Sequence, residues 1–221
     1  QLPPFCVQGE RLEGVAEWLE RLPNVPSCKL RTNRRSHPAI VEFADGIFYE
    51  GLRAGVKCAE SNSVLQHYAF PRVNHPIEFI HISGEHEKED GGTSLFNTSE
   101  ATVAADLARL LSRNMRDADI ALVCAYKAQK EMLQELLDGG KFVIVTADEC
   151  QGSEWKAVIL LTTRTSGSSG FLRDNNRLTV AFTRAREALF VLGDLPYLRQ
   201  TYPIWQTIIQ KADDLGYIRE L

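Results

Sequence analysis

Hydrophobic residues along this chain follow two recurring patterns. Short apolar runs, typical of buried strands, occur at residues 28–32, 77–83, 119–125, 143–145, 157–161 and 188–192. Apolar residues spaced three and four positions apart predict helices at residues 10–22, 38–50, 98–112, 126–138, 178–185 and 203–215. Because strands and helices alternate, we expect an α/β fold with a doubly wound, mainly parallel sheet flanked by helices.

Proline, glycine and small polar residues mark the ends of the predicted helices. Pro23 ends the first helix, and Pro38 suits the first turn of the second. Gly51 is the expected cap at the end of that second helix. Thr98 or Ser99 is the expected N-cap of the third. These signals agree with the order of elements that the hydrophobic pattern predicts.

The composition is that of an ordinary globular protein. The 221 residues are 44% hydrophobic and 24% charged, which is enough for one sizeable core, and we expect a single domain. The net charge of −4 means that any binding of nucleic acid must use a local basic patch. No apolar run is long enough to span a membrane, and no signal peptide is recognisable.

Cysteine and histidine usage argues against a metal site. The five cysteines are scattered without a C-x-x-C pair, and the five histidines show no ligand spacing. A disulfide framework is disfavoured for the same reason. We therefore expect no bound metal in this chain and a reducing, intracellular location, cytoplasmic or nuclear.

Two polar segments beside predicted strands carry the candidate chemistry. The first, at residues 143–154, includes Asp148, Gln151, Gly152 and Glu154. The second, N-R-L-T-V-A-F-T-R-A-R at residues 176–186, includes Arg177, Arg184 and Arg186. A polar turn after a strand suits a ligand site beyond the carboxyl ends of a parallel sheet. Arginines on a helix are usually a solvated face, so the second segment alone would not indicate a site.

Together the two segments resemble motifs V and VI of superfamily 1 helicases. The similarity is to the RNA-surveillance type, the relatives of the nonsense-mediated-decay helicase, whose patterns are V-D-x-F-Q-G-x-E and R-L-N-V-A-L-T-R-A-R. This sequence departs from them at Glu149, Cys150, Thr179 and Phe182. Residues 33–51 resemble motif IV, Q-Y-R-M-H-P-x-I-x-x-F followed by F-Y-x-G. Arg35 falls on the family's phosphate-contacting arginine, and Arg34 replaces a tyrosine that stacks on adenine.

The beginning of the chain resembles the end of motif III. Residues 1–4 read Q-L-P-P, and the family's glutamine at the position of Gln1 reaches the terminal phosphate of the nucleotide. We therefore expect residues 1–4 to be a remnant of the first RecA-like domain and residues 5–221 to be the second RecA-like domain. A disordered tail is the alternative for residues 1–4.

The resemblance also predicts contacts to a nucleic acid. Where the family has T-P-Y-x-x-Q, with a threonine that touches phosphate, this chain has Cys124, Ala125 and Tyr126. The loss of the threonine weakens one contact, but backbone amides at the start of the next helix could hold a phosphate. Asp148 completes the expected nucleic-acid-binding residues.

The function that the resemblance implies is the C-terminal half of an ATP-dependent helicase, with single-stranded RNA favoured over DNA. Arg35 and Arg184 are the expected catalytic residues, acting as arginine fingers because guanidinium groups pair with phosphate and stay charged. The expected nucleotide-binding residues are Gln1, Arg34, Gln151, Gly152, Glu154 and Arg177. ATP and Mg²⁺ are the expected ligands. The P-loop and the Mg²⁺ ligands would belong to the first RecA-like domain of the same parent, because G-x-x-x-x-G-K-[ST] is absent from these 221 residues.

Three other functions remain open from the sequence. The same core serves DNA helicases and helicase–nucleases, which further domains of the parent would reveal. A degenerate, non-hydrolysing scaffold that binds nucleic acid is disfavoured by the intact motif arginines. A small-molecule-binding α/β domain is disfavoured because no glycine-rich turn joins a strand to a helix.

Overall fold

A single parallel sheet organises the part of the chain that the computed structural model describes, which is residues 30–55, 62–168 and 170–220 with the isolated positions 22, 26 and 28. In sheet order its six strands are β10 (Ile218–Glu220), β3 (Ile77–His81), β9 (Ala185–Gly193), β8 (Trp155–Leu161), β6 (Ile120–Cys124) and β7 (Val143–Thr146). Every neighbouring pair is parallel. The predicted α/β class and doubly wound sheet are therefore confirmed.

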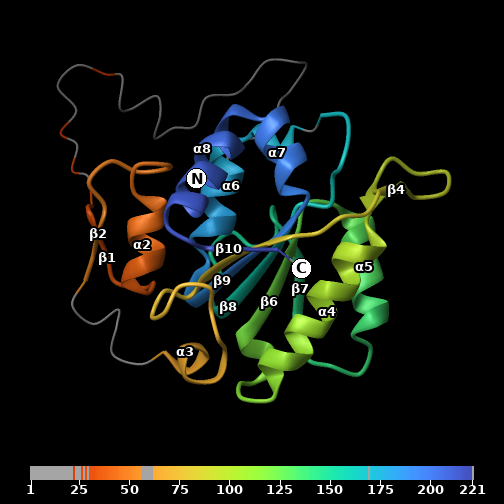
Figure 1. Ribbon diagram of the computed structural model, residues 1–221, viewed down its shortest axis with the longest axis horizontal. Helices are drawn as coiled ribbons and strands as arrows, with labels where there is room; N and C mark the ends of the chain where they lie inside the picture. The colour runs from red at the N-terminus through yellow and green to blue at the C-terminus, as the bar shows by residue number, and fades with distance from the viewer. Residues whose placement is uncertain are drawn as a thin grey trace.

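Helices cover both faces of this sheet (Figure 1). One face carries α2 (Pro38–Ala44), α6 (Asn175–Phe182), α7 (Leu195–Thr201) and α8 (Pro203–Asp214). The other face carries α3 (Ser63–His67), α4 (Thr98–Ser112) and α5 (Lys127–Leu136). Two short strand pairs lie outside the main sheet: β1 (Thr32–Asn33) with β2 (Arg53–Ala54), and β4 (Glu87–Lys88) with β5 (Leu95–Phe96). Short 3-10 helices occupy residues Asp117–Asp119 and Phe171–Arg173.

Alternate residues of the strands build two hydrophobic cores. In β6, for example, Ala121 and Val123 face the core under α2, α6, α7 and α8, whereas Ile120 and Leu122 face the core under α3, α4 and α5. All four side chains are fully buried. Strands buried on both faces explain why the sequence shows continuous apolar runs at these positions rather than alternation.

Several helix ends differ from the expected ones. The second predicted helix stops at Ala44, well before Gly51, because Asp45 turns the backbone to an extended conformation and its side chain accepts a hydrogen bond from the Leu52 amide (2.9 Å). The N-cap of α4 is Asn97, not Thr98 or Ser99; its side chain accepts a hydrogen bond from the Glu100 amide (3.0 Å). The predicted helix at residues 10–22 and the remnant at residues 1–4 lie outside the described residues.

Candidate functional site

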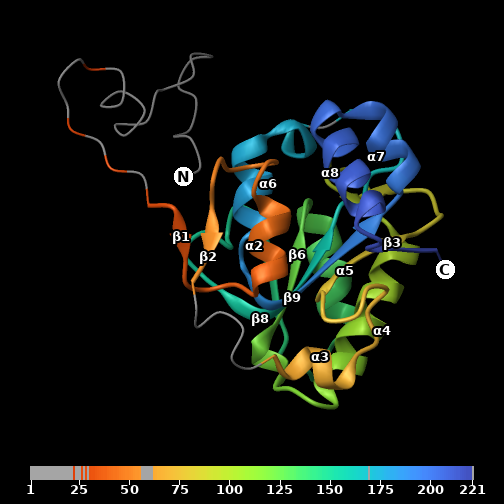
Figure 2. The same ribbon diagram turned by 60° about the vertical axis from the view of Figure 1, so that its left-hand side comes forward.

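The motif arginines gather at the amino ends of β8 and β9. Arg35 lies in the loop before α2, Arg184 lies between α6 and β9, and Glu154 immediately precedes β8. Figure 2 shows α2 and α6 close together beside these two strands. The loop before α2 is fastened to β9 because the His37 amide donates a hydrogen bond to the Arg186 carbonyl (2.7 Å).

Hydrogen bonds to the backbone interlock the two candidate arginine fingers. The Nη1 atom of Arg35 donates to the carbonyl of Thr183 (3.1 Å), the residue before Arg184. In turn, Nη1 of Arg184 donates to the carbonyl of Ser153 (3.0 Å), the residue before Glu154. Segments 148 residues apart in sequence therefore meet at one place.

The charges of this cluster are only partly compensated. Glu154 lies 2.6 Å from Nε of Arg35 and 3.6 Å from Nη1 of Arg186. Arg184 has neither of these carboxylate contacts, and burial, followed by the nearby charge of Arg35, lowers its pKa. The side chain of Arg35 remains 35% exposed and that of Glu154 41% exposed. Positive charge held beside solvent in this way is suited to an anionic ligand.

The turn at residues 147–154 runs from the side of the sheet where its parallel strands end to the side where they begin. It begins at the carboxyl end of β7 and ends at the amino end of β8. Asp148, near the first end, forms an ion pair with Arg177 of α6 (3.1 Å). Gln151 and Gly152 are exposed, and Gly152 has the left-handed φ of +86° that favours glycine.

The position of the arginine cluster corrects one expectation from the sequence. We expected the site beyond the carboxyl ends of the strands, but Arg184 and Glu154 lie at the amino ends of β9 and β8. Glu154 lies there because the turn at residues 147–154 runs from the carboxyl end of β7 to the amino end of β8, and Arg184 lies there because it directly precedes β9. The first residues of the turn lie at the expected edge and its last residues at the opposite one.

The candidate nucleic-acid contacts lie at the carboxyl edge of the sheet. The side chain of Cys124, at the end of β6, is fully buried, so only its main chain can contact a ligand. Ala125 and Tyr126 are partly exposed. The Ala128 amide at the start of α5 already donates to Oγ of Ser94 (2.9 Å), which leaves fewer amides for a phosphate than the sequence suggested.

Two further residues near this edge were missed by the sequence analysis. Arg164 donates from Nε to the hydroxyl of Tyr126 (2.7 Å). Glu100 is buried and accepts two hydrogen bonds from the Thr163 amide (2.9 Å each), and burial raises the pKa of its carboxyl to about 8. Arg164 lies three residues after the apolar strand that ends at Leu161, and Glu100 lies in the first turn of α4, positions at which polar residues are common in any α/β protein.

The remaining candidate residues are peripheral or outside the described part. Arg34 is exposed in the loop before Arg35, with its Cγ atom against Gly55. Gln1 lies outside the described residues. Among the residues that the structure describes, no group of histidine, cysteine, aspartate and glutamate side chains could hold a metal ion. Within the same residues, no helix is long and apolar enough to cross a membrane.

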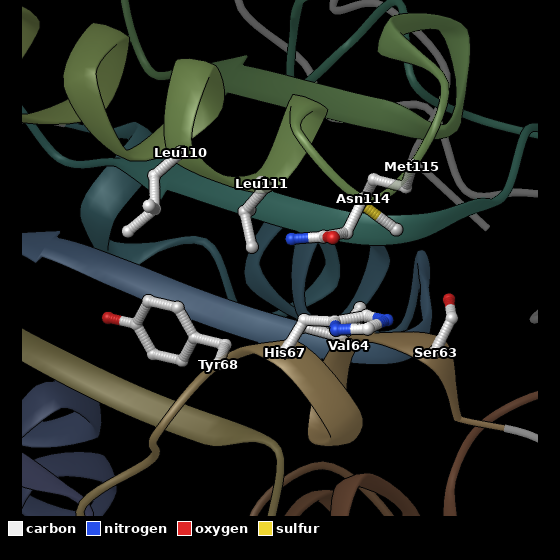
Figure 3. Close-up of a pocket in the computed structure, with 8 residues that line it drawn as sticks. All are labelled: Ser63, Val64, His67, Tyr68, Leu110, Leu111, Asn114 and Met115. Atoms are coloured by element: carbon white, nitrogen blue, oxygen red, sulfur yellow. The ribbon is translucent and has the colours of Figure 1, made fainter.

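Figure 3 shows a small pocket between α3 and the end of α4. None of its lining residues belongs to the arginine cluster or to the candidate nucleic-acid contacts. The pocket is lined by Ser63, Val64, His67, Tyr68, Leu110, Leu111, Asn114 and Met115. Its volume of about 10 Å³ is near the minimum for one water molecule. It therefore cannot hold a nucleotide.

Comparisons with known proteins identify the family. A family model described as an AAA domain matches residues 14–196. The chain is 33% identical over 232 residues to an uncharacterized ATP-dependent helicase of Caenorhabditis elegans, covering 98% of this chain and 15% of that protein. It is 30% identical over 223 residues to the ATP-dependent helicase upf1 of Schizosaccharomyces pombe, covering 94% and 24%. It is 29% identical over 236 residues to regulator of nonsense transcripts 1 of C. elegans, covering 98% and 22%.

These relatives are much longer than the chain, which spans at most about a quarter of their length. The similarity nevertheless extends over nearly all of this chain and includes the described site. The parallel sheet with helices on both faces agrees with the same assignment. The chain therefore belongs to the AAA domain family and is the second RecA-like domain of a superfamily 1 helicase of the nonsense-mediated-decay type.

Proposed function

We propose that this chain is the C-terminal RecA-like half of an ATP-dependent helicase that acts on single-stranded RNA. The observation that carries the proposal is the meeting of Arg35 and Arg184 beside solvent at the amino ends of β8 and β9. Its partner would be the first RecA-like domain of the same parent, which supplies the P-loop. The parent's intracellular location is part of the same proposal.

Arg35 and Arg184 would act as arginine fingers. Hydrolysis of ATP spreads negative charge over the terminal phosphoryl oxygens, so catalysis consists mainly of positioning and charge neutralisation. Both guanidinium groups are oriented by backbone carbonyls, those of Thr183 and Ser153, and therefore need little reorganisation. Glu154 balances the charge of Arg35 until a phosphate competes for it.

The other nucleotide-binding residues would contribute less directly. We propose that Gln151, Gly152, Glu154 and Arg177 shape this side of the nucleotide cleft, with Arg34 near the base and Gln1 near the terminal phosphate. Mg²⁺ would accompany ATP and be held by the first domain. ATP supplies the reacting phosphoryl group, and this domain supplies positive charge.

The nucleic-acid track would follow the carboxyl edge of the sheet, through the main chain at Cys124 and Ala125, the ring of Tyr126, and Asp148. The turn at residues 147–154 reaches from this edge to the arginine cluster, so closure around ATP would be transmitted to the bound strand. RNA is favoured over DNA because relatives are named regulators of nonsense transcripts.

The first test uses the full-length parent with Arg35→Ala and Arg184→Ala. Each substitution should lower RNA-stimulated ATP turnover on the order of a thousandfold, as expected for an arginine finger, with a smaller loss of nucleotide affinity. Arg113→Ala is the matched control, because Arg113 is an exposed arginine at the end of α4. Turnover within a few-fold of the wild type would assign that arginine a structural role only.

The second part of the same test compares the binding of single-stranded RNA with that of single-stranded DNA. Wild-type parent should bind single-stranded RNA more tightly than DNA of the same sequence and length. Equal or weaker affinity for RNA would favour the DNA-helicase alternative while leaving the arginine fingers untouched.

A further inference from the structure

We infer that Arg164 is a positioning residue that fixes the ring of Tyr126 for stacking on a base of the bound single strand. The inference rests on the proposed nucleic-acid track and extends it to a residue that neither the motifs nor the comparisons assign. Arg164 follows β8 in the chain, whereas Tyr126 follows β6, so the two meet at the carboxyl edge of neighbouring strands.

The contact between the two side chains is specific. Nε of Arg164 donates to the Tyr126 hydroxyl at 2.7 Å, and the guanidinium carbon lies 5.8 Å from the ring centroid. Nη1 of Arg164 donates to the carbonyl of Ser166 at 2.8 Å, which fixes the guanidinium from its other side. Both residues remain partly exposed. An aromatic ring that is held in place but accessible suits stacking by a base.

The loop that carries Arg164 is anchored in the protein interior. The preceding residue, Thr163, is buried and has a left-handed φ of 68°, which is uncommon for a β-branched residue. Its amide donates to both carboxyl oxygens of Glu100, which is itself buried. A strained residue held by a buried partner indicates that the direction of the loop matters.

Contacts from two other elements hold the far side of the loop. The hydroxyl of Thr165 accepts from the His86 amide (3.2 Å) and contacts Nδ1 of its ring (2.9 Å). The hydroxyl of Tyr197, in α7, contacts the carbonyls of Ser166 (3.2 Å) and Gly167 (2.9 Å). Arg164 therefore extends from a fixed backbone, and it can restrict Tyr126 rather than move with it.

Stacking is the contact that this arrangement favours. Tyr126 occupies the N-cap position of α5 but makes no capping hydrogen bond with its side chain. Aromatic rings bind single strands by stacking on bases, which tolerates any sequence and depends on a ring of fixed orientation. The hydrogen bond from Arg164 reduces the ring's freedom before the strand arrives.

The test measures binding of a single-stranded RNA containing 2-aminopurine to the full-length parent. Tyr126→Ala should weaken binding by about 5- to 150-fold, the range for loss of one stacked base. Arg164→Gln and Tyr126→Phe should each cause a smaller loss, because each removes the hydrogen bond and keeps the ring. The variant that combines Arg164→Gln with Tyr126→Phe should bind the RNA no more weakly than either single variant, since both substitutions remove the same hydrogen bond. Arg164→Lys should resemble Arg164→Gln, and Arg113→Ala should resemble the wild type.

The salt dependence of the same binding separates positioning from a direct phosphate contact. If Arg164 positions Tyr126, the slope of log affinity against log salt should be unchanged in Arg164→Gln. A slope shallower by about 0.7, the value for one single-strand phosphate contact, with full affinity in Tyr126→Phe, would overturn the inference. So would wild-type affinity and 2-aminopurine quenching in Tyr126→Ala. Failure of the wild-type parent to bind RNA would instead overturn the proposed function.

Discussion

Among the proposed nucleotide-binding residues, Arg34 differs most clearly from the residue that the family has at its position. Its side chain is exposed, next to Arg35 and against Gly55. A guanidinium is planar and can stack on adenine in place of the usual tyrosine, contributing about 0.5–2 kcal/mol. In the parent, Arg34→Tyr should preserve ATP affinity, whereas Arg34→Ala should weaken it about 2- to 30-fold, as measured by calorimetric titration. Equal affinity for the alanine variant and the wild type would show that Arg34 points into solvent.

At the residue scale, the sequence predicted candidate site residues but not the surroundings of their side chains. Motif patterns pointed to Arg35, Arg184 and Glu154, and the structure brings these three together. The pairing of Tyr126 with Arg164 was not predictable, because it depends on which strands are neighbours in the sheet. For the same reason the pattern could not show that the Cys124 side chain is buried.

Helix α4 and the loop after β8 are joined by a carboxyl group that titrates near neutral pH. Burial raises the pKa of Glu100 from 4.5 to about 8 in the folded chain. Folding therefore favours the protonated form, and the stability from this group is complete below about pH 4.5 and is lost as the pH rises towards 8. The Glu100 carboxyl can change the free energy of unfolding by at most about 1.4 kcal/mol per pH unit.

Glu100→Gln should therefore flatten the decline in the free energy of unfolding between pH 5 and pH 8. Urea denaturation of the 221-residue chain at several pH values measures this slope. Glu135→Gln is the matched control, since Glu135 is exposed on the neighbouring helix α5. The same pH slope in Glu100→Gln and the wild type would show that the carboxyl does not titrate in this range.

At the element scale, hydrophobic spacing located most strands and helices, but the ends depended on side-chain contacts. The second helix was expected to reach Gly51, since Ile47 continues its apolar stripe. Ile47 does pack against the core, but from the loop that follows Asp45. A residue beyond the end of a helix can still be buried in the core, so the periodicity of apolar residues alone overestimates helix length.

For the whole molecule, the proposed division of the nucleotide site between two domains predicts what the chain can do alone. The 221-residue chain should fold, because helices cover both faces of its sheet, but it should show no ATP turnover with or without RNA. Its binding to RNA should be weak, because few phosphate contacts are available at a net charge of −4, and each contact should add about 0.7 to the slope of log affinity against log salt. Binding should be independent of sequence, because contacts to the backbone carry little sequence information. Steady-state turnover and binding at two salt concentrations test these points. RNA-stimulated turnover by the chain alone would contradict the assignment of the P-loop to another domain.

The α/β class was predictable at this scale because alternating strands and helices have few packed arrangements. The position of the arginine cluster at the amino ends of the strands was not predictable from the sequence. The turn at residues 147–154 has no helical or strand pattern, and only its path in space shows that it crosses from the end of β7 to the start of β8.

The strand order has a consequence for synthesis on the ribosome. Both neighbours of β3 are made long after it, since Ile77 pairs with Leu189 and Phe79 with Ile218. At a typical rate of about 5–20 residues per second, roughly a hundred residues require about 5–20 s, during which this apolar strand has no partner. Glu78, the second residue of β3, places one charge in this strand, a feature that opposes aggregation of exposed strands. Nascent chains stalled before residue 185 should therefore depend on chaperones more than completed ones.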